Sequence, residues 1–81
     1  MARVLITGAG GLIGTACFDL FKRKGYEIVA TDVPGADLSM MQKAGVRTAY
    51  MDISDTEALK NIVKGVDIVI HTAGVFDFGA K

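Results

Sequence analysis

The most chemically specific residues of this sequence are three glycines, Gly8, Gly11 and Gly14, which follow the apolar run 4–6 and lead into a helix-like pattern. A chain that leaves a parallel strand here must turn sharply. A side chain at Gly8 or Gly11 would obstruct that turn or the approach of a pyrophosphate to the backbone. A side chain at Gly14 would hold the helix away from the strand, and the helix N-terminus would offer N–H groups to phosphates. The spacing predicts a dinucleotide-binding turn; the alternative is a glycine-rich turn that binds no ligand.

A carboxylate at the end of the second strand-like run extends this candidate site. Asp32 lies 18 positions after Gly14, where an acidic residue can accept hydrogen bonds from the adenosine ribose hydroxyls. The same charge would repel a 2′-phosphate, and Val33 and Pro34, which follow, bring no cation to offset it. The pattern therefore predicts NAD in preference to NADP. The alternative is that Asp32 is a solvated aspartate that begins a turn.

The elements that must position these residues alternate along the chain. Strand-like runs cover residues 3–7, 27–32, 46–51 and 67–71, and helix-like runs cover 11–24, 38–44 and 55–64. This β-α-β-α-β-α-β pattern predicts an α/β fold with a Rossmann-like parallel sheet, helices on both faces and strand order 3-2-1-4, the first half of a doubly wound fold. A capping box is expected to start the third helix at Ser54 and Glu57. An apolar stripe of the first helix is expected at Ile13, Ala16, Cys17, Leu20 and Phe21.

The string from position 7 to position 14 carries a family resemblance, because it reads Thr7-Gly8-Ala9-Gly10-Gly11-Leu12-Ile13-Gly14. It resembles the Thr-Gly-x-x-Gly-x-x-Gly signature of the extended short-chain dehydrogenases/reductases, the nucleotide-sugar epimerase and dehydratase type. It differs from the dehydrogenase spacing Gly-x-Gly-x-x-Gly, because Ile13 stands where the third glycine would be. The resemblance covers essentially the whole chain. It implies that the cofactor contacts Gly8, Gly10, Gly11, Leu12, Ile13 and Gly14.

Two later segments continue the resemblance. In the family, an aspartate and a hydrophobic residue after the third strand hold the adenine, which implies this role for Asp52 and Ile53. The alternative is that Asp52 is a helix-entry residue. The family also carries a His-x-Ala-Ala string after the fourth strand, where this chain has His71-Thr72-Ala73-Gly74, with glycine in place of the second alanine. Thr72, Ala73 and Gly74 are therefore expected along the cofactor, and we expect His71 to orient the loop rather than to act as a general base.

The length and the charge balance limit the other possibilities. The 81 residues form one domain, expected to be the N-terminal, NAD-binding part of a longer chain, because the fourth strand would otherwise be an exposed edge. Nine basic and nine acidic residues cancel, which gives no indication of nucleic-acid binding. Cys17 is the single cysteine, so an internal disulfide is excluded. We expect it to be a small core residue. Without a long apolar run or a secretory signal, a cytoplasmic location and no membrane partner are expected.

The catalytic pair of the resembled family is missing from this sequence. That pair is Tyr-x-x-x-Lys, but the residues four positions after Tyr26 and Tyr50 are Ala30 and Ser54. The chain alone is therefore expected to be inactive. Its parent would be an NAD-dependent epimerase, dehydratase or dehydrogenase that acts on a small molecule, with a homodimer as its candidate assembly. A non-catalytic dinucleotide-binding or redox-sensing module and a structural fragment that binds nothing are the alternatives.

Overall fold

The computed structural model describes residues 2–52 and 54–72, and it contains a parallel sheet of four strands in the order β3-β2-β1-β4. This confirms the predicted Rossmann-like fold and its strand order. Every predicted element is present, although several are shorter by one or two residues at an end. The elements are β1 (Arg3–Thr7), α1 (Leu12–Arg23), β2 (Glu27–Asp32), α2 (Ser39–Lys43), β3 (Arg47–Tyr50), α3 (Thr56–Ile62) and β4 (Ile68–His71).

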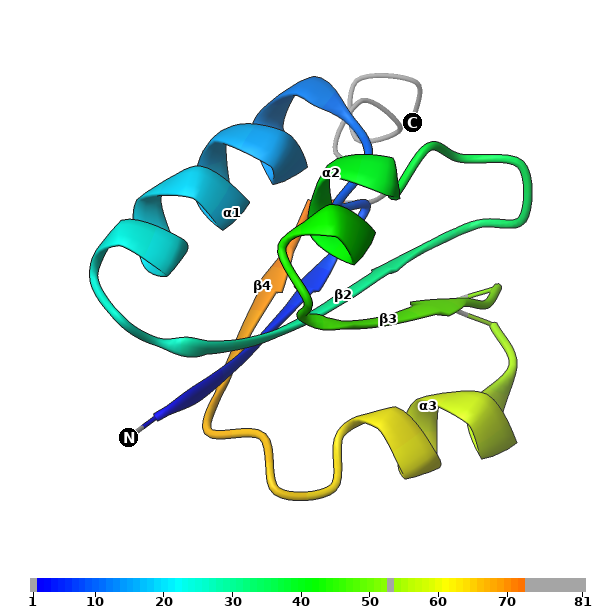
Figure 1. The fold of residues 1–81 in the computed structure, drawn as a ribbon. Helices are drawn as coiled ribbons and strands as arrows, with labels where there is room; N and C mark the ends of the chain where they lie inside the picture. Colours follow the sequence, from blue (N-terminus) through cyan, green and yellow to red (C-terminus); the bar gives the residue numbers. More distant parts are fainter. Residues whose placement is uncertain (1, 53, 73–81) are drawn as a thin grey trace, which may run out of the picture.

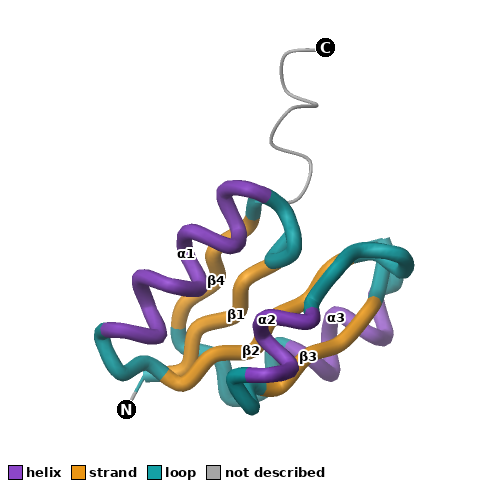
Figure 2. Tube along the Cα trace, turned by 45° about the horizontal axis from the view of Figure 1, so that its top comes forward, coloured by secondary structure: helices purple, strands orange, loops and turns teal. Residues whose placement is uncertain are grey.

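The helices cover both faces of the sheet. Figures 1 and 2 show α1 and α2 on one face and α3 on the other. Successive side chains of a strand point to opposite faces, so the central strands supply both cores. Val4 and Ile6 of β1 pack with Phe18 of α1 on the first face, whereas Leu5 packs with Ile62 of α3 on the second. Burial on both faces explains the continuous apolar run of β1.

The buried face of α1 is rotated by about one residue from the predicted stripe. Gly14 and Phe18 are buried, and Cys17 and Phe21 pack against the same core. Ile13 and Leu20, by contrast, are 44% and 46% exposed. The prediction was wrong at these positions and at the exposed Ala16. The reason is that the close packing of Gly14 on the preceding turn fixes the rotation of the helix, and apolar spacing alone does not reveal this contact.

The start of α3 also differs from the prediction. Asp55 is the N-cap, and its Oδ1 accepts a hydrogen bond from the Ala58 N–H at 3.1 Å. The hydroxyl of Ser54 instead donates to Oδ1 of Asp52 at 2.8 Å. The predicted Ser54–Glu57 capping box is therefore wrong. Serine and aspartate are similarly good N-caps, so the neighbouring Asp52 decides which of them is used.

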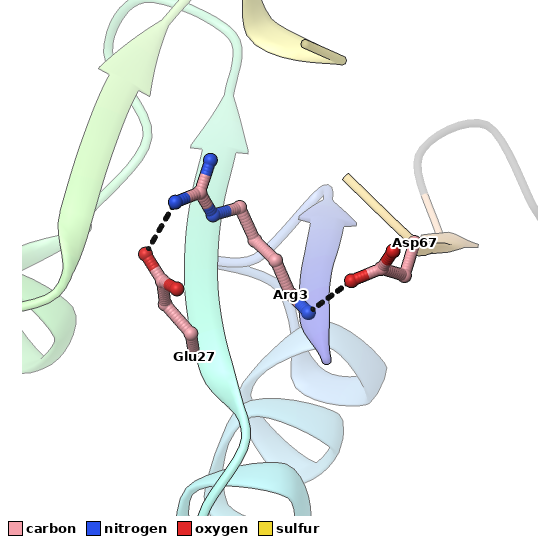
Figure 3. Close-up of polar contacts among 3 residues, drawn as sticks. All are labelled: Arg3, Glu27 and Asp67. Atoms are coloured by element: carbon pink, nitrogen blue, oxygen red, sulfur yellow. Dashed lines mark hydrogen bonds and ion pairs between the residues drawn. The ribbon is translucent and has the colours of Figure 1, made fainter. Parts of the chain in front are cut away.

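The amino ends of the strands are held by polar contacts of Arg3 (Figure 3). Its backbone N–H donates to Oδ2 of Asp67 at 2.8 Å, which ties β1 to the segment before β4. Its guanidinium forms an ion pair of 2.9 Å with Glu27, the first residue of β2. The Arg3 and Glu27 side chains are 33% and 56% exposed, so this ion pair is worth at most about 1 kcal/mol.

The strand β4 lies at one edge of the described sheet. It pairs in parallel with β1 from Val4↔Ile68 to Thr7↔His71. Ile68 and Ile70 pack against the core shared with α1, whereas Val69 is 53% exposed. Within residues 2–52 and 54–72, no helix combines the length and the apolar character needed to cross a membrane.

Candidate dinucleotide-binding site

The candidate site lies where β1, β2 and β4 end. The register pairs Thr7 of β1 with Thr31 of β2 and with His71 of β4, so these strands end at the same level of the sheet. The glycine loop, defined here as residues 8–11, follows β1 directly and leads into α1. The predicted residues Asp32 and Thr72 lie on either side of this loop. The carboxyl edge of a parallel sheet is where folds of this type bind ligands.

The glycine loop is a tight turn held by its own backbone. Gly8 has a φ of 66°, in the left-handed region that glycine tolerates best. The N–H of Gly11 donates to the Gly8 carbonyl at 3.0 Å and closes the turn. The N–H of Ala9 donates to the Thr31 carbonyl at 3.0 Å and ties the loop to β2. These main-chain bonds close the turn and fix it against β2.

The contact of Gly14 with this turn is closer than any side chain would allow. A Cβ atom at Gly14 would overlap the carbonyl oxygen of Gly8 and would lie 2.7 Å from Cα of Ala9. Both neighbours are backbone atoms, so rotation of a side chain cannot relieve the overlap. The expected role of Gly14 in packing the helix onto the turn is confirmed.

Gly11 has space around it, in contrast to Gly14. It is exposed and is the N-cap of α1, with extended φ and ψ angles of −80° and 178° that any residue can adopt. Among the described residues, a Cβ atom there would meet only the Gly8 carbonyl oxygen, at an ordinary contact distance of 3.4 Å. The N–H groups in the first turn of a helix have no acceptor within the helix, and no acidic side chain occupies the first turn of α1. The protein itself does not require glycine here, and the N-terminus of α1 is open to an anion.

Both carboxylate oxygens of Asp32 accept backbone hydrogen bonds. Oδ2 accepts from the N–H of Gly10 at 2.9 Å, and Oδ1 accepts from the N–H of Val33 at 2.7 Å. The second bond belongs to the turn after β2, as the solvated-aspartate alternative requires. The first bond, however, places the carboxylate against the glycine loop. Each carboxylate oxygen can accept more than one hydrogen bond, so Asp32 keeps capacity for a ligand hydroxyl while its orientation is fixed.

The end of β4 is tied to the glycine loop by threonine hydroxyls. Thr72 donates its hydroxyl to the carbonyls of Thr7 and Gly8, the latter at 3.2 Å, and its N–H to Thr7 at 3.2 Å. The Thr7 hydroxyl and Nδ1 of His71 form a hydrogen bond of 2.7 Å. This contact agrees with the orienting role expected for His71. Ala73 and Gly74 lie outside the described residues, so their expected contacts with a cofactor stay predictions.

Asp52 lies further along the carboxyl edge, after β3. The adjacent Met51 donates its N–H to the Asp32 carbonyl at 2.8 Å, which brings this segment beside the end of β2. Oδ1 of Asp52 accepts from the N–H of Ser54 at 2.9 Å and from its hydroxyl. These bonds favour the charged form and hold the pKa of Asp52 below its ordinary value. They fit a helix-entry residue, the adenine role of Asp52 stays a prediction, and Ile53 lies outside the described residues.

One contributor to the glycine loop was not predicted from the sequence. Thr15, in α1, donates its hydroxyl to the carbonyl of Gly11, four residues earlier, and lies 3.3 Å from the carbonyl of Ala9. Threonine in a helix often bonds the carbonyl four residues back, and that spacing was the available signal. The hydroxyl therefore stabilises the helix end of the loop.

The described part of the chain contains no cluster of side chains suited to hold a metal ion.

The parallel sheet, its strand order and the glycine turn after β1 define a Rossmann-like fold. The chain belongs to the NAD dependent epimerase/dehydratase family, whose model matches residues 4–81. It is 30% identical over 77 residues to a 3-beta-hydroxysteroid dehydrogenase from Mycolicibacterium neoaurum, a match that covers 95% of this chain and 20% of the relative. It is 32% identical over 73 residues to an L-arabinose 1-dehydrogenase (NAD(P)(+)) from Haloferax volcanii, covering 90% and 26%.

Solved structures share this fold. A nucleoside-diphosphate-sugar epimerase from Pseudomonas aeruginosa matches with a TM-score of 0.80 and 20% identity, over 94% of this chain and 25% of the epimerase. A UDP-glucose-4-epimerase from Stenotrophomonas maltophila with bound NAD matches with a TM-score of 0.78 and 24% identity, over 90% and 24%. The chain therefore spans about a quarter of the length of these relatives.

Proposed function

We propose that this chain binds NAD at the carboxyl edge of its sheet and forms the cofactor-binding part of an NAD-dependent oxidoreductase or epimerase. The observation that carries the proposal is the contrast between Gly11, at the end of the glycine loop, and Gly14, in the first turn of α1. Gly14 is crowded by backbone atoms, whereas Gly11, three residues earlier, is open and exposed. The fold does not require glycine at position 11, which lies at the open N-terminus of α1. A pyrophosphate bound there would need the space that a side chain would fill, and this need explains the glycine.

Different residues of this chain would bind different parts of NAD. The backbone of Gly11 and the first turn of α1 would bind the pyrophosphate, because N–H groups and the helix dipole favour an anion there. Asp32, held by Gly10 and Val33, would accept hydrogen bonds from the adenosine ribose and would repel a 2′-phosphate. Bound NAD would supply the hydride acceptor of the reaction. We extend to this chain the cofactor that the Stenotrophomonas maltophila epimerase contains.

The substrate of the complete protein is proposed only as a class. The relatives named above are a hydroxysteroid dehydrogenase, a sugar dehydrogenase and sugar-nucleotide epimerases. Their names have in common a small-molecule substrate that carries hydroxyl groups. We propose a substrate of this class for the complete protein, with its acid/base pair outside this chain.

A non-catalytic binding module remains the second candidate, and the two tyrosines of this chain do not separate it from the first. Tyr26 packs edge-to-face on Phe21 at 5.2 Å between ring centroids, and Tyr50 lies in β3. Neither is followed by lysine at the fourth position. An assay of hydride transfer by the complete protein separates the two candidates, because a module would bind NAD without reducing it.

The experiment that tests the proposal is calorimetric titration of the complete protein with NAD and, separately, with NADP. We expect saturable binding of NAD with one site per chain and weaker binding of NADP. A complete protein that is folded and takes up neither cofactor would contradict the proposal.

A further inference from the structure

We propose that Gly10 is a positioning residue that sets the preference of this site for NAD over NADP, an inference that rests on the proposed function. Gly10 is not one of the three glycines that define the motif spacing. It acts through its neighbours. Because Gly10 lacks a side chain, Asp32 and the segment before α2 can pack closely against the glycine loop.

The contacts around Gly10 show how little space it has. A Cβ atom at Gly10 would lie 2.8 Å from the backbone carbonyl oxygen of Asp37 and 3.1 Å from Oδ2 of Asp32. Two oxygen atoms, one from the end of β2 and one from the segment before α2, thus lie next to the position that a Cβ atom of residue 10 would take. The first contact is with backbone, so it cannot be relieved by a change of rotamer.

The segment before α2 is not free to move away. Its first turn is closed by a hydrogen bond of 3.1 Å from the N–H of Ala36 to the Val33 carbonyl. Oδ1 of Asp37 accepts from the N–H of Ser39 at 2.9 Å. The next residue, Leu38, is fully buried in the core shared with α1. These contacts fix the position of the Asp37 carbonyl. A side chain at Gly10 would therefore push the glycine loop and the Asp32 carboxylate apart.

The consequence for the cofactor follows from the bond between Gly10 and Asp32. The N–H of Gly10 holds the carboxylate at 2.9 Å, at the place where we propose that the adenosine ribose binds. A displaced carboxylate would accept the ribose hydroxyls less well and would repel a 2′-phosphate less strongly. A Cβ atom at Gly11 would make no such contact with β2, because among the described residues it would meet only the Gly8 carbonyl oxygen. A change at Gly10 should alter the ratio of the two affinities, whereas a change at Gly11 should alter both affinities alike.

The test compares Gly10→Ala and Gly11→Ala in the complete protein by calorimetric titration with NAD and with NADP. For Gly10→Ala we expect the Kd of NAD to rise about tenfold, as for the loss of one hydrogen bond to a charged group. The Kd of NADP should change less, so the preference for NAD should fall. For Gly11→Ala we expect both Kd values to rise and their ratio to stay at the wild-type value. Thermal melting of both variants controls for the fold.

The outcomes separate this inference from the proposed function. A folded Gly10→Ala variant with the wild-type preference for NAD would overturn the role of Gly10 and leave the proposed function intact. Wild-type protein that binds neither cofactor would overturn both. If Gly10→Ala does not fold, Asp32→Glu takes its place, because it keeps the charge but moves the carboxylate away from the Gly10 N–H. That variant should also bind NAD about tenfold more weakly, and wild-type affinity would overturn the inference.

Discussion

The two ends of the sheet are held together in different ways. At the carboxyl end, the glycine loop is fixed by main-chain hydrogen bonds, by threonine hydroxyls on carbonyls and by backbone contacts that exclude a Cβ atom at Gly10 and Gly14. At the amino end, Arg3 joins β1 to β2 through an ion pair whose side chains are partly exposed. The backbone at the carboxyl end has almost no room to move at Gly10 and Gly14. At the amino end, the side chains of the Arg3–Glu27 ion pair can exchange their contact for water.

This difference indicates where the sequence is constrained by function. An exposed ion pair contributes little to stability and can be replaced by other surface residues. At Gly10 and Gly14 a Cβ atom would lie too close to backbone atoms, and between them lies one glycine, Gly11, that the described part of the fold leaves open. The contrast predicts that substitutions at the carboxyl end affect folding or binding strongly and separately, and that substitutions at the amino end affect neither very much.

The largest effect is expected at Gly14. Replacement by valine places branched carbons where the Gly8 carbonyl and Ala9 Cα already lie, so α1 must move off the turn. We expect the free energy of unfolding of the complete protein to fall by about 3 kcal/mol or more. Urea denaturation measures this change, with Gly11→Val as the matched control. Equal stability of the two variants would show that the crowding at Gly14 has no consequence.

Gly11→Val should have the opposite profile. Valine adopts the extended backbone found at this N-cap, and the fold has room for its Cβ, so stability should fall by no more than about 1 kcal/mol. NAD binding should weaken by about 100-fold or more, equivalent to about 2.8 kcal/mol, because the pyrophosphate can no longer approach the backbone. Titration calorimetry with a parallel thermal melt checks both halves. Normal NAD affinity in this variant would mean that the pyrophosphate site is placed wrongly.

Asp32→Ala should have a moderate effect on binding that depends on the cofactor. It removes the ribose acceptor, the repulsion of a 2′-phosphate and the anchor of the Gly10 N–H at once. We expect NAD to bind about tenfold more weakly and the preference over NADP to shrink. The measurement is the ratio of the two dissociation constants in the wild type and the variant. An undiminished preference for NAD would assign the discrimination to another residue.

The smallest effect is expected at the amino end. Glu27→Gln removes the charge that pairs with Arg3 while it keeps the size of the side chain. The free energy of unfolding should change by less than about 1 kcal/mol, because the pair is partly exposed. NAD affinity should stay at the wild-type value. A large loss of binding in this variant would break the contrast between the two ends.

The sequence predicted the fold well because its signals are local and repeated. Strand order follows from the alternation of elements, and the packing role of Gly14 follows from the motif spacing. The rotation of α1 was missed because the contact of Gly14 with the turn outweighs the spacing of apolar residues such as Ile13 and Leu20. The cap of α3 was missed because Asp52 competes for the hydroxyl of Ser54.

Part of the candidate site was also predictable, because its signals are local in the sequence. Gly8, Gly11 and Asp32 stand at recognisable distances along the chain. The crowding of Gly10 against the Asp37 carbonyl joins segments that only the folded sheet brings together, and no spacing in the sequence reports it. The assignment of the glycine turn, Asp32, Asp52, Ile53 and residues 72–74 to the cofactor stays a prediction.

Hydrogen exchange of the complete protein with and without saturating NAD tests the central claim most directly, because it reads both ends of the sheet at once. We predict slower exchange of backbone N–H groups in the glycine loop and in the first turn of α1. The rates around Arg3 and Glu27 at the amino end should stay unchanged. Protection confined to the amino end, or no protection in the glycine loop at saturating NAD, would contradict the account.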